Sequence, residues 1–216
     1  MTAQEPRAGD RVPSYINIRK PALLLVEGKD EERFFGALLR SWRSTKLQVS
    51  GTAGKTKLRD RLELLRVSPK FNEVVKSIGI IRDADEDPDG AFQSVRGALK
   101  AAGFSVPSAQ FAPAGSSPKV TVMIMPGNDR TGALEDLCLD TFKGEPARQC
   151  VDEYFECLKG KDVPLPGHLA KAKVQALIAS YDKEVRLLGE AAEAGFWSWD
   201  HAALDQVKRF LREVAS

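Results

Sequence analysis

Three short and strongly apolar segments limit the folds open to this chain more than any other feature. They are ALLLV at 22–26, VVKSIGII at 74–81 and VTVMIM at 120–125, and a shorter strand candidate lies at 46–50. Strands are this apolar when both faces of their sheet are buried, which is typical of parallel sheets covered by helices. The segments therefore predict a mostly parallel sheet of about four strands.

Helical periodicity fills the stretches between these strands. The expected helices, in chain order, are 30–42, a stripe through Leu58, Leu62 and Leu65, 91–102, 131–142, 151–158, 169–180 and 199–214. Strands that alternate with helices favour an α/β fold with right-handed crossovers. We expect a Rossmann-like α/β domain over 21–142, preceded by a lead-in segment at 1–20 and followed by a helical extension at 143–216 that packs on it.

Cysteine and histidine usage argues against several common kinds of site. A chain of 216 residues can bury a core without disulfides or structural zinc. Its three cysteines form no CxxC pair, and His168 and His201 are far apart in sequence. A disulfide framework, a zinc site and a Ser-His-Asp triad are therefore poorly supported. The chain also lacks a long apolar run and an apolar signal core, so we expect a cytoplasmic protein that does not enter a membrane.

Charge is unevenly distributed, although the net charge is only +2. Residues 38–70 contain nine Lys or Arg residues and two acidic residues, whereas residues 83–89 contain five acids. The basic stretch is either a solvated helix surface or a guide for a polyanion. The acidic segment follows directly from an expected strand.

Carboxylates follow three of the expected strands. Glu27 comes after the first, Asp83 and Asp85 end the third, and Glu135 and Asp136 lie shortly after the fourth. The carboxyl ends of parallel strands share one edge of a sheet, where ligands gather, so we expect these side chains to converge. If the third strand continues, Asp83 and Asp85 point to the same side of it. For this pair alone, a polar turn before a helix is an equally good interpretation.

Converging carboxylates repel one another unless a cation neutralises them. Mg²⁺ accepts a few carboxylate oxygens, retains several waters and leaves room for substrate phosphates. Such an ion can polarise a phosphoryl oxygen and activate water. We therefore expect Mg²⁺ or Mn²⁺ at this edge of the sheet.

Two further motifs fail on spacing. GTAGKT at 51–56 places only two residues between its glycines, whereas a P-loop needs four, so an ATPase is rejected. DEDPDG at 85–90 resembles the start of a calcium loop, but Arg96 stands where the loop requires a bidentate Glu.

The motifs VEGKDEERFF and IIRDADEDPDG, each following an apolar strand, together resemble the Toprim domain. This fold occurs in bacterial-type primases, topoisomerases, OLD-family nucleases, small ribonucleases and recombination mediators. The resemblance covers about 21–140 and implies that Glu27 is a metal ligand or general acid/base. It also implies that Asp83 and Asp85 bind metal. The acidic segment is longer than the usual Toprim motif, and the chain is too short for a topoisomerase and lacks primase-like zinc ligands.

PGNDRTGALEDL at 126–137 resembles a late motif of small stand-alone Toprim-like proteins related to the OLD nucleases. The resemblance implies that Glu135 and Asp136 reach the metal centre. Gly54, Lys55 and Lys57 resemble the glycine-lysine turn of these proteins, and the helix that carries Lys171 and Lys173 belongs to the same pattern.

Together, the motifs and the resemblance lead to the hypothesis that the protein is a Mg²⁺-dependent enzyme that cleaves phosphodiester bonds in DNA or RNA. Glu27, Asp83, Asp85 and Lys173 are the expected catalytic residues, with Lys173 stabilising transition-state charge. The expected nucleic-acid contacts are Lys29, Lys55, Lys57 and Arg59. The alternatives are a non-catalytic Toprim module that binds nucleic acid or a partner protein, and an unrelated phosphotransferase with Asp83 as nucleophile. Both Toprim hypotheses, the nuclease and the non-catalytic module, are compatible with a homodimer or with a partner protein.

Overall fold

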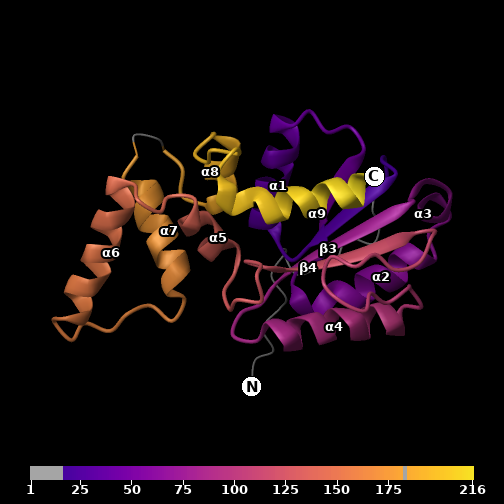
Figure 1. Cartoon of the computed structure of the whole chain (residues 1–216), viewed down its shortest axis with the longest axis horizontal. Coiled ribbons are helices and arrows are strands. Elements are labelled where there is room, and N and C mark those ends of the chain that lie inside the picture. Colours follow the sequence, from indigo (N-terminus) through magenta and orange to yellow (C-terminus); the bar gives the residue numbers. More distant parts are fainter. Residues whose placement is uncertain (1–16, 182–183) are drawn as a thin grey trace, which may run out of the picture.

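A parallel sheet of four strands forms the centre of the computed structural model, which describes residues 17–181 and 184–216 (Figure 1). The strand order is β2-β1-β3-β4, and all neighbouring strands are parallel. The strands are β1 (Ala22–Val26), β2 (Leu47–Gly51), β3 (Ser77–Asp83) and β4 (Lys119–Met125). The predicted α/β class with a parallel sheet of about four strands is confirmed. The predicted lead-in segment lies mostly outside the described residues.

Helices cover both faces of this sheet and continue beyond it. They are α1 (Lys29–Ser41), α2 (Leu58–Arg66), α3 (Pro69–Val74), α4 (Pro88–Ala101), α5 (Leu134–Asp140), α6 (Pro146–Lys159), α7 (Leu169–Ala179), α8 (Leu188–Glu193) and α9 (Asp205–Ala215), with single 3₁₀ turns η1 (Lys55–Lys57) and η2 (Ala202–Leu204). Helices α2, α3 and α4 pack on one face, and α1 and α9 pack on the other. In Figure 1, α6 and α7 stand at the end of the molecule away from α3.

The apolar strands arise because each buries residues in two separate cores. In β1, Leu23 and Leu25 join the core beneath α2, α3 and α4, whereas Leu24 and Val26 join the core beneath α1 and α9. Successive side chains of a strand point to opposite faces, so a strand between two helical layers must be apolar at every position.

Helix α9 comes unusually close to the sheet at Gly79. A Cβ built on Gly79 would lie only 2.7 Å from Cγ2 of Val214. The Ser77 hydroxyl donates a hydrogen bond to the backbone carbonyl of Val214. Glycine in this central strand therefore makes room for the last turn of α9, which fixes the C-terminal helix on the sheet.

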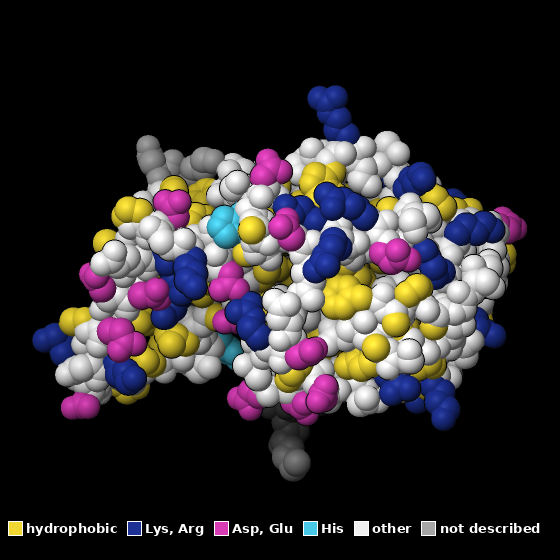
Figure 2. All heavy atoms as spheres, viewed as in Figure 1, with side chains coloured by type: hydrophobic (Ala, Val, Ile, Leu, Met, Phe, Trp, Pro, Cys, Tyr) yellow, Lys and Arg dark blue, Asp and Glu magenta, His cyan; other side chains and the backbone are white. Residues whose placement is uncertain are grey.

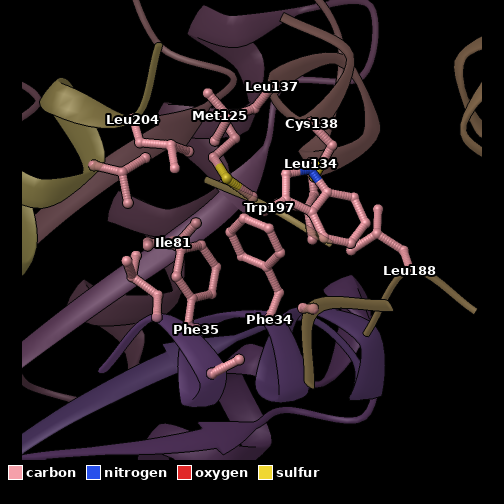
Figure 3. Packing of buried hydrophobic residues seen from close by; sticks show 14 of the residues in the cluster. Phe34, Phe35, Ile81, Met125, Leu134, Leu137, Cys138, Leu188, Trp197 and Leu204 are labelled. Atoms are coloured by element: carbon pink, nitrogen blue, oxygen red, sulfur yellow. The ribbon is translucent and has the colours of Figure 1, made fainter. Parts of the chain in front are cut away.

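The short helix α8, which lies between two expected helices, docks on α1. The backbone N–H of Gly189 donates to Asp30 Oδ1 at 3.0 Å, and Arg33 pairs with Glu190 at 3.1 Å. Just beyond α8, Trp197 packs edge-on against Phe34 with ring centroids 5.8 Å apart, and Figure 3 shows it beside α5 residues as well.

Two predicted elements are present but begin later than expected. No single helix spans 199–214, because η2 and α9 begin only at Ala202 and Asp205. The third strand begins at Ser77 rather than Val74, because helix α3, which Ser68 caps and Pro69 begins, extends to Val74. Among the described residues, no helix has the length and apolar character that a bilayer span requires.

Candidate metal centre

The carboxyl ends of β1 and β3, which are adjacent in the sheet, each carry an acidic residue. Glu27 follows the last residue of β1, and Asp83 is the last residue of β3. Asp85 lies two residues further along. Glu31 in the first turn of α1 and Glu135 in the first turn of α5 are close enough to act electrostatically on Asp83. The sheet edge therefore collects carboxylates from three separate parts of the chain.

Asp83 is the centre of this cluster. Burial, followed by the negative charges of Glu27, Glu31, Glu135 and Asp85, raises the pKa of Asp83 well above its ordinary value. Asp83 Oδ1 also accepts a hydrogen bond of 3.1 Å from the backbone N–H at the start of α5. The backbone therefore holds the Asp83 carboxylate in a position where four other carboxylates repel it.

Glu27 is largely buried and faces one cation. Arg82 Nε lies 3.6 Å from Glu27 Oε1, which is too long for a hydrogen bond, and Oε1 accepts none from the described residues. Burial raises the pKa of Glu27; Arg82 opposes this shift, and Glu31 and Asp85 add to it. One buried carboxylate oxygen therefore lacks a donor, a state that costs free energy unless another ligand supplies positive charge.

Glu31, which lies within the expected helix 30–42 and carried no predicted site role, also belongs to the cluster. Burial raises the pKa of Glu31, and the charge of Glu135 raises it further. Its carboxylate folds back over Gly28, where an added Cβ would lie 2.9 Å from Glu31 Oε2. The spacing of four residues from Glu27 across a strand-to-helix turn is the signal that could have identified it.

Asp85 and Asp136 are placed by the backbone in different ways. The strand does not continue through Asp85, which has a left-handed φ of 51° and whose backbone exchanges two hydrogen bonds with Gly132. Asp85 and Asp83 are therefore not strand neighbours on one side of the sheet. Asp136 accepts a hydrogen bond of 2.8 Å from the backbone N–H of Ala133 and so caps α5.

A cleft of about 780 Å³ opens over Asp83, Asp85, Glu135 and Asp136, whereas Glu27 and Glu31 are not among its lining residues. One wall carries Arg82, Asp83, Asp85, Glu135 and Asp136. The other wall is the start of α7, and its lining residues are Gly167, His168, Leu169, Ala170 and Lys171. Lys171 and His168 thus line the same cleft as the carboxylates, and the imidazole of His168 is the one aromatic ring among the lining residues.

A family model described as "Protein of unknown function (DUF3226)" matches residues 21–216. The chain belongs to the DUF3226 family. A comparison with curated proteins finds no match for it.

This DUF3226 protein is similar to two solved structures. The first is the C-terminal region of the OLD protein of Xanthomonas campestris pv. campestris, with 16% identity, coverage of 91% of this chain and 96% of that chain, and a TM-score of 0.46. The second is the C-terminal region of the Burkholderia pseudomallei OLD protein, with 12% identity, coverage of 92% and 100%, and a TM-score of 0.45.

The basic residues predicted to contact nucleic acid do not gather at one place in the carboxylate cluster. Lys29, whose side chain is 87% exposed, pairs with Glu32 at 2.7 Å beside the cluster. Lys57 and Arg59 pair with acids on their own helical segment, and the side chain of Lys55 lies outside what the structure describes.

Helix α7 carries the two lysines that the family pattern singled out. Lys173 is not among the residues that line the cleft, and its ammonium donates to Asp152 of α6 at 2.6 Å. Lys171, one half-turn earlier, lines the cleft.

The donor set fits a hard cation better than any other group. Mg²⁺ and Mn²⁺ prefer carboxylate oxygens, and the buried, undonated Oε1 of Glu27 is an oxygen of this kind. Among the described residues, however, no three His, Cys, Asp or Glu side chains converge on one metal position as they stand. A cation would therefore be accompanied by side-chain rotation at Glu31 or Glu135, which lie in the first turns of α1 and α5.

Proposed function

We propose that this protein is a Mg²⁺- or Mn²⁺-dependent enzyme that cleaves phosphodiester bonds in DNA or RNA. The observation that carries the proposal is the set of carboxylates gathered at the carboxyl edge of the sheet, where burial, followed by their mutual repulsion, raises the pKa of Asp83. Such a cluster is unfavourable on its own and favourable around a divalent cation. Its position at the carboxyl edge of a parallel sheet is where ligands of α/β proteins bind.

Glu27, Asp83 and Glu135 would hold the cation, with Asp85 and Glu31 in support. When bound, it supplies a Lewis acid that polarises the phosphoryl group and lowers the pKa of water. Glu27 would take the proton of the attacking water, while the bond between phosphorus and the departing ester oxygen breaks and that oxygen takes a proton from solvent. Lys171, on the opposite wall, neutralises charge that develops on the phosphoryl oxygens.

Phosphates on either side of the scissile bond need further contacts. Lys29 begins α1 two residues after Glu27 and is almost fully exposed, so we assign it to a flanking phosphate. His168 supplies the one ring in the lining of the cleft, and no Phe, Tyr or Trp accompanies it. Recognition mainly through phosphates predicts cutting with little sequence preference.

The direct test is cleavage of labelled single- and double-stranded DNA and RNA while Mg²⁺ and Mn²⁺ are titrated. We expect metal-dependent cutting that Asp83→Asn and Glu135→Gln reduce by roughly 100-fold or more. Asp89→Asn, an exposed acid in the first turn of α4 outside the cleft lining, is the matched control. Its cutting should equal that of the wild type.

The alternative is a Toprim module that binds nucleic acid or a partner without cutting it. The observation that favours this function is the absence, among described side chains, of a ready three-donor group. Calorimetric Mg²⁺ binding that Asp83→Asn abolishes, with no cutting of any substrate, would support the module. Absence of metal binding in the wild type would show that the site assignment is wrong.

A further inference from the structure

The amino edge of the sheet, opposite the carboxylate cluster, carries a row of lysines. Lys46 directly precedes β2, Lys76 directly precedes β3, and Lys119 begins β4. Their backbones are linked across the edge, because the Lys119 N–H donates to the Lys76 carbonyl and the Ala22 N–H donates to the Lys46 carbonyl. Lys46 and Lys76 are two strands apart, so their backbones are separated by about 10 Å.

Further cations reach the same edge because the helices run antiparallel to the strands and end there. We define the basic edge as Lys20, Arg43, Lys46, Arg66, Lys70, Lys76, Lys100, Lys119 and Arg212. On the described segments that form this edge, the acids are Glu73 and Glu213, and Glu213 pairs with Lys119 at 3.0 Å. Figure 2 shows Lys and Arg side chains spread over the end of the molecule where α3 lies.

Local structure accounts for only part of this charge. Arg66, Lys100 and Arg212 stand in the last turns of their helices, where a cation is stabilised by the helix dipole. Lys46 and Lys76 are exposed and precede strands, so they stabilise no helix end. Lys70 is exposed in the first turn of α3, where a cation is unfavourable.

We propose that the basic edge binds the phosphate backbone of nucleic acid as a second surface, separate from the cleft. The seven residues of β3 place this edge about 20 Å from the carboxylates. Phosphates bound at this edge would hold a long substrate while another segment of it reaches the cleft. The choice of nucleic acid among polyanions rests on the proposed function.

An anionic membrane is a weaker match for the basic edge. Binding at a bilayer surface usually combines cations with several apolar side chains that enter the headgroup region. Among the described large apolar residues that are exposed, only Leu64 and Val67 are near this edge. Nucleic acid needs only the cations, and its affinity falls as salt displaces them.

The test is binding of fluorescently labelled DNA and RNA oligonucleotides, measured by anisotropy with EDTA present and over a range of salt. The variant is Lys46→Gln/Lys70→Gln/Lys76→Gln. Its control is Lys143→Gln/Lys159→Gln/Lys161→Gln, which removes three exposed lysines on and beside α6 and so changes the net charge equally. Circular dichroism checks that both variants fold.

We expect the basic-edge variant to lose at least tenfold in affinity and its slope of log affinity against log salt to shrink by about 2 to 3. The control should bind like the wild type. Equal losses in both variants, or none in the basic-edge variant, would overturn the proposal. The proposal would also be overturned if the basic-edge variant bound nucleic acid normally but lost binding to anionic vesicles. The same holds if it bound nucleic acid normally but lost self-association through the acidic edge of a second copy.

The same assay separates this proposal from the proposed function. Asp83→Asn removes cutting if the enzyme assignment is right, but it should leave EDTA-resistant binding unchanged because Asp83 lies at the other end of the sheet. If the basic edge binds and no metal-dependent cutting is found, only the enzyme assignment fails. If cutting is found and basic-edge binding is not, only the second surface fails.

Discussion

The carboxylate of Asp83 accepts a hydrogen bond of 3.1 Å from the backbone N–H of Leu134, fifty-one residues further along the chain. This contact joins the end of β3 to the start of α5. Glu135 is the next residue of that helix, so the same hydrogen bond that orients Asp83 also sets where Glu135 enters the cluster. The acidic site is therefore built by the junction of two elements rather than by one motif.

Asp83→Asn should separate the structural role of this side chain from its charge. The amide oxygen can still accept from Leu134, while the repulsion with Glu27, Glu31 and Glu135 is removed. We expect the metal-free variant to be more stable than the wild type by on the order of 1 kcal/mol. Urea unfolding in EDTA measures the difference.

The metal response should be opposite in sign. Mg²⁺ stabilises a folded state that binds it, so the wild type should gain stability on Mg²⁺ addition and Asp83→Asn should gain little. Asp83→Ala leaves the Leu134 N–H without its acceptor and should be less stable than Asp83→Asn. If Asp83→Asn were destabilising in EDTA, repulsion would not dominate at this site.

The pH dependence of stability should report the same repulsion. The pKa values of Asp83, Glu27 and Glu31 are raised in the folded protein, so the folded state binds more protons than the unfolded state as pH falls. Stability from these groups is fully present below their ordinary values of 3.8 and 4.5 and is lost as pH rises through the raised pKa values. The advantage of Asp83→Asn in EDTA should therefore be largest near pH 7 and shrink toward pH 4.

Urea titrations of both proteins across this range measure that difference. The comparison between the two proteins cancels the contribution of other acids, provided that these titrate alike in both. An advantage that grew as pH fell would contradict the raised pKa of Asp83.

Much of the fold and the centre of the site could be predicted from the sequence, because both depend on short-range patterns. Continuous apolar runs marked the strands, and Glu27 and Asp83 were identified because each ends such a run. Glu31 was missed because an acid in the first turn of a helix is ordinary by itself. Its role depends on the fold of the chain over Gly28, which apolar periodicity does not record.

Long-range packing explains the other differences. Helix α8 has only six residues and is stabilised by contacts with α1 that are about 160 residues distant in sequence. Asp85 leaves the strand because its backbone pairs with Gly132. The sequence near Asp85 contains nothing that predicts this pairing. The lysines of the basic edge are scattered along the sequence, and only the parallel arrangement of the strands brings them together.

Gly79 should be sensitive to any side chain. An alanine Cβ would meet Val214 on α9 and Cδ1 of Leu24 at 3.1 Å or less, so Gly79→Ala should destabilise the protein by about 1–3 kcal/mol. Val214→Ala removes the closest atoms and should partly rescue Gly79→Ala. Urea unfolding of the two single variants and the double variant should give a coupling energy of at least about 0.5 kcal/mol. Purely additive effects would show that α9 does not restrict this position.

Lys171 and Lys173 should differ in what their loss affects. Lys173 pairs with Asp152 and holds α7 against α6, so Lys173→Gln should reduce stability by up to about 1 kcal/mol and leave cleavage intact. Lys171 lines the cleft, so Lys171→Gln should lower kcat/KM by roughly tenfold or more without a comparable loss of stability. Cleavage kinetics and thermal unfolding of both variants test this assignment. Loss of cleavage in Lys173→Gln at unchanged stability would instead give Lys173 the catalytic role that the sequence motif implied, and would require α7 to turn on substrate binding.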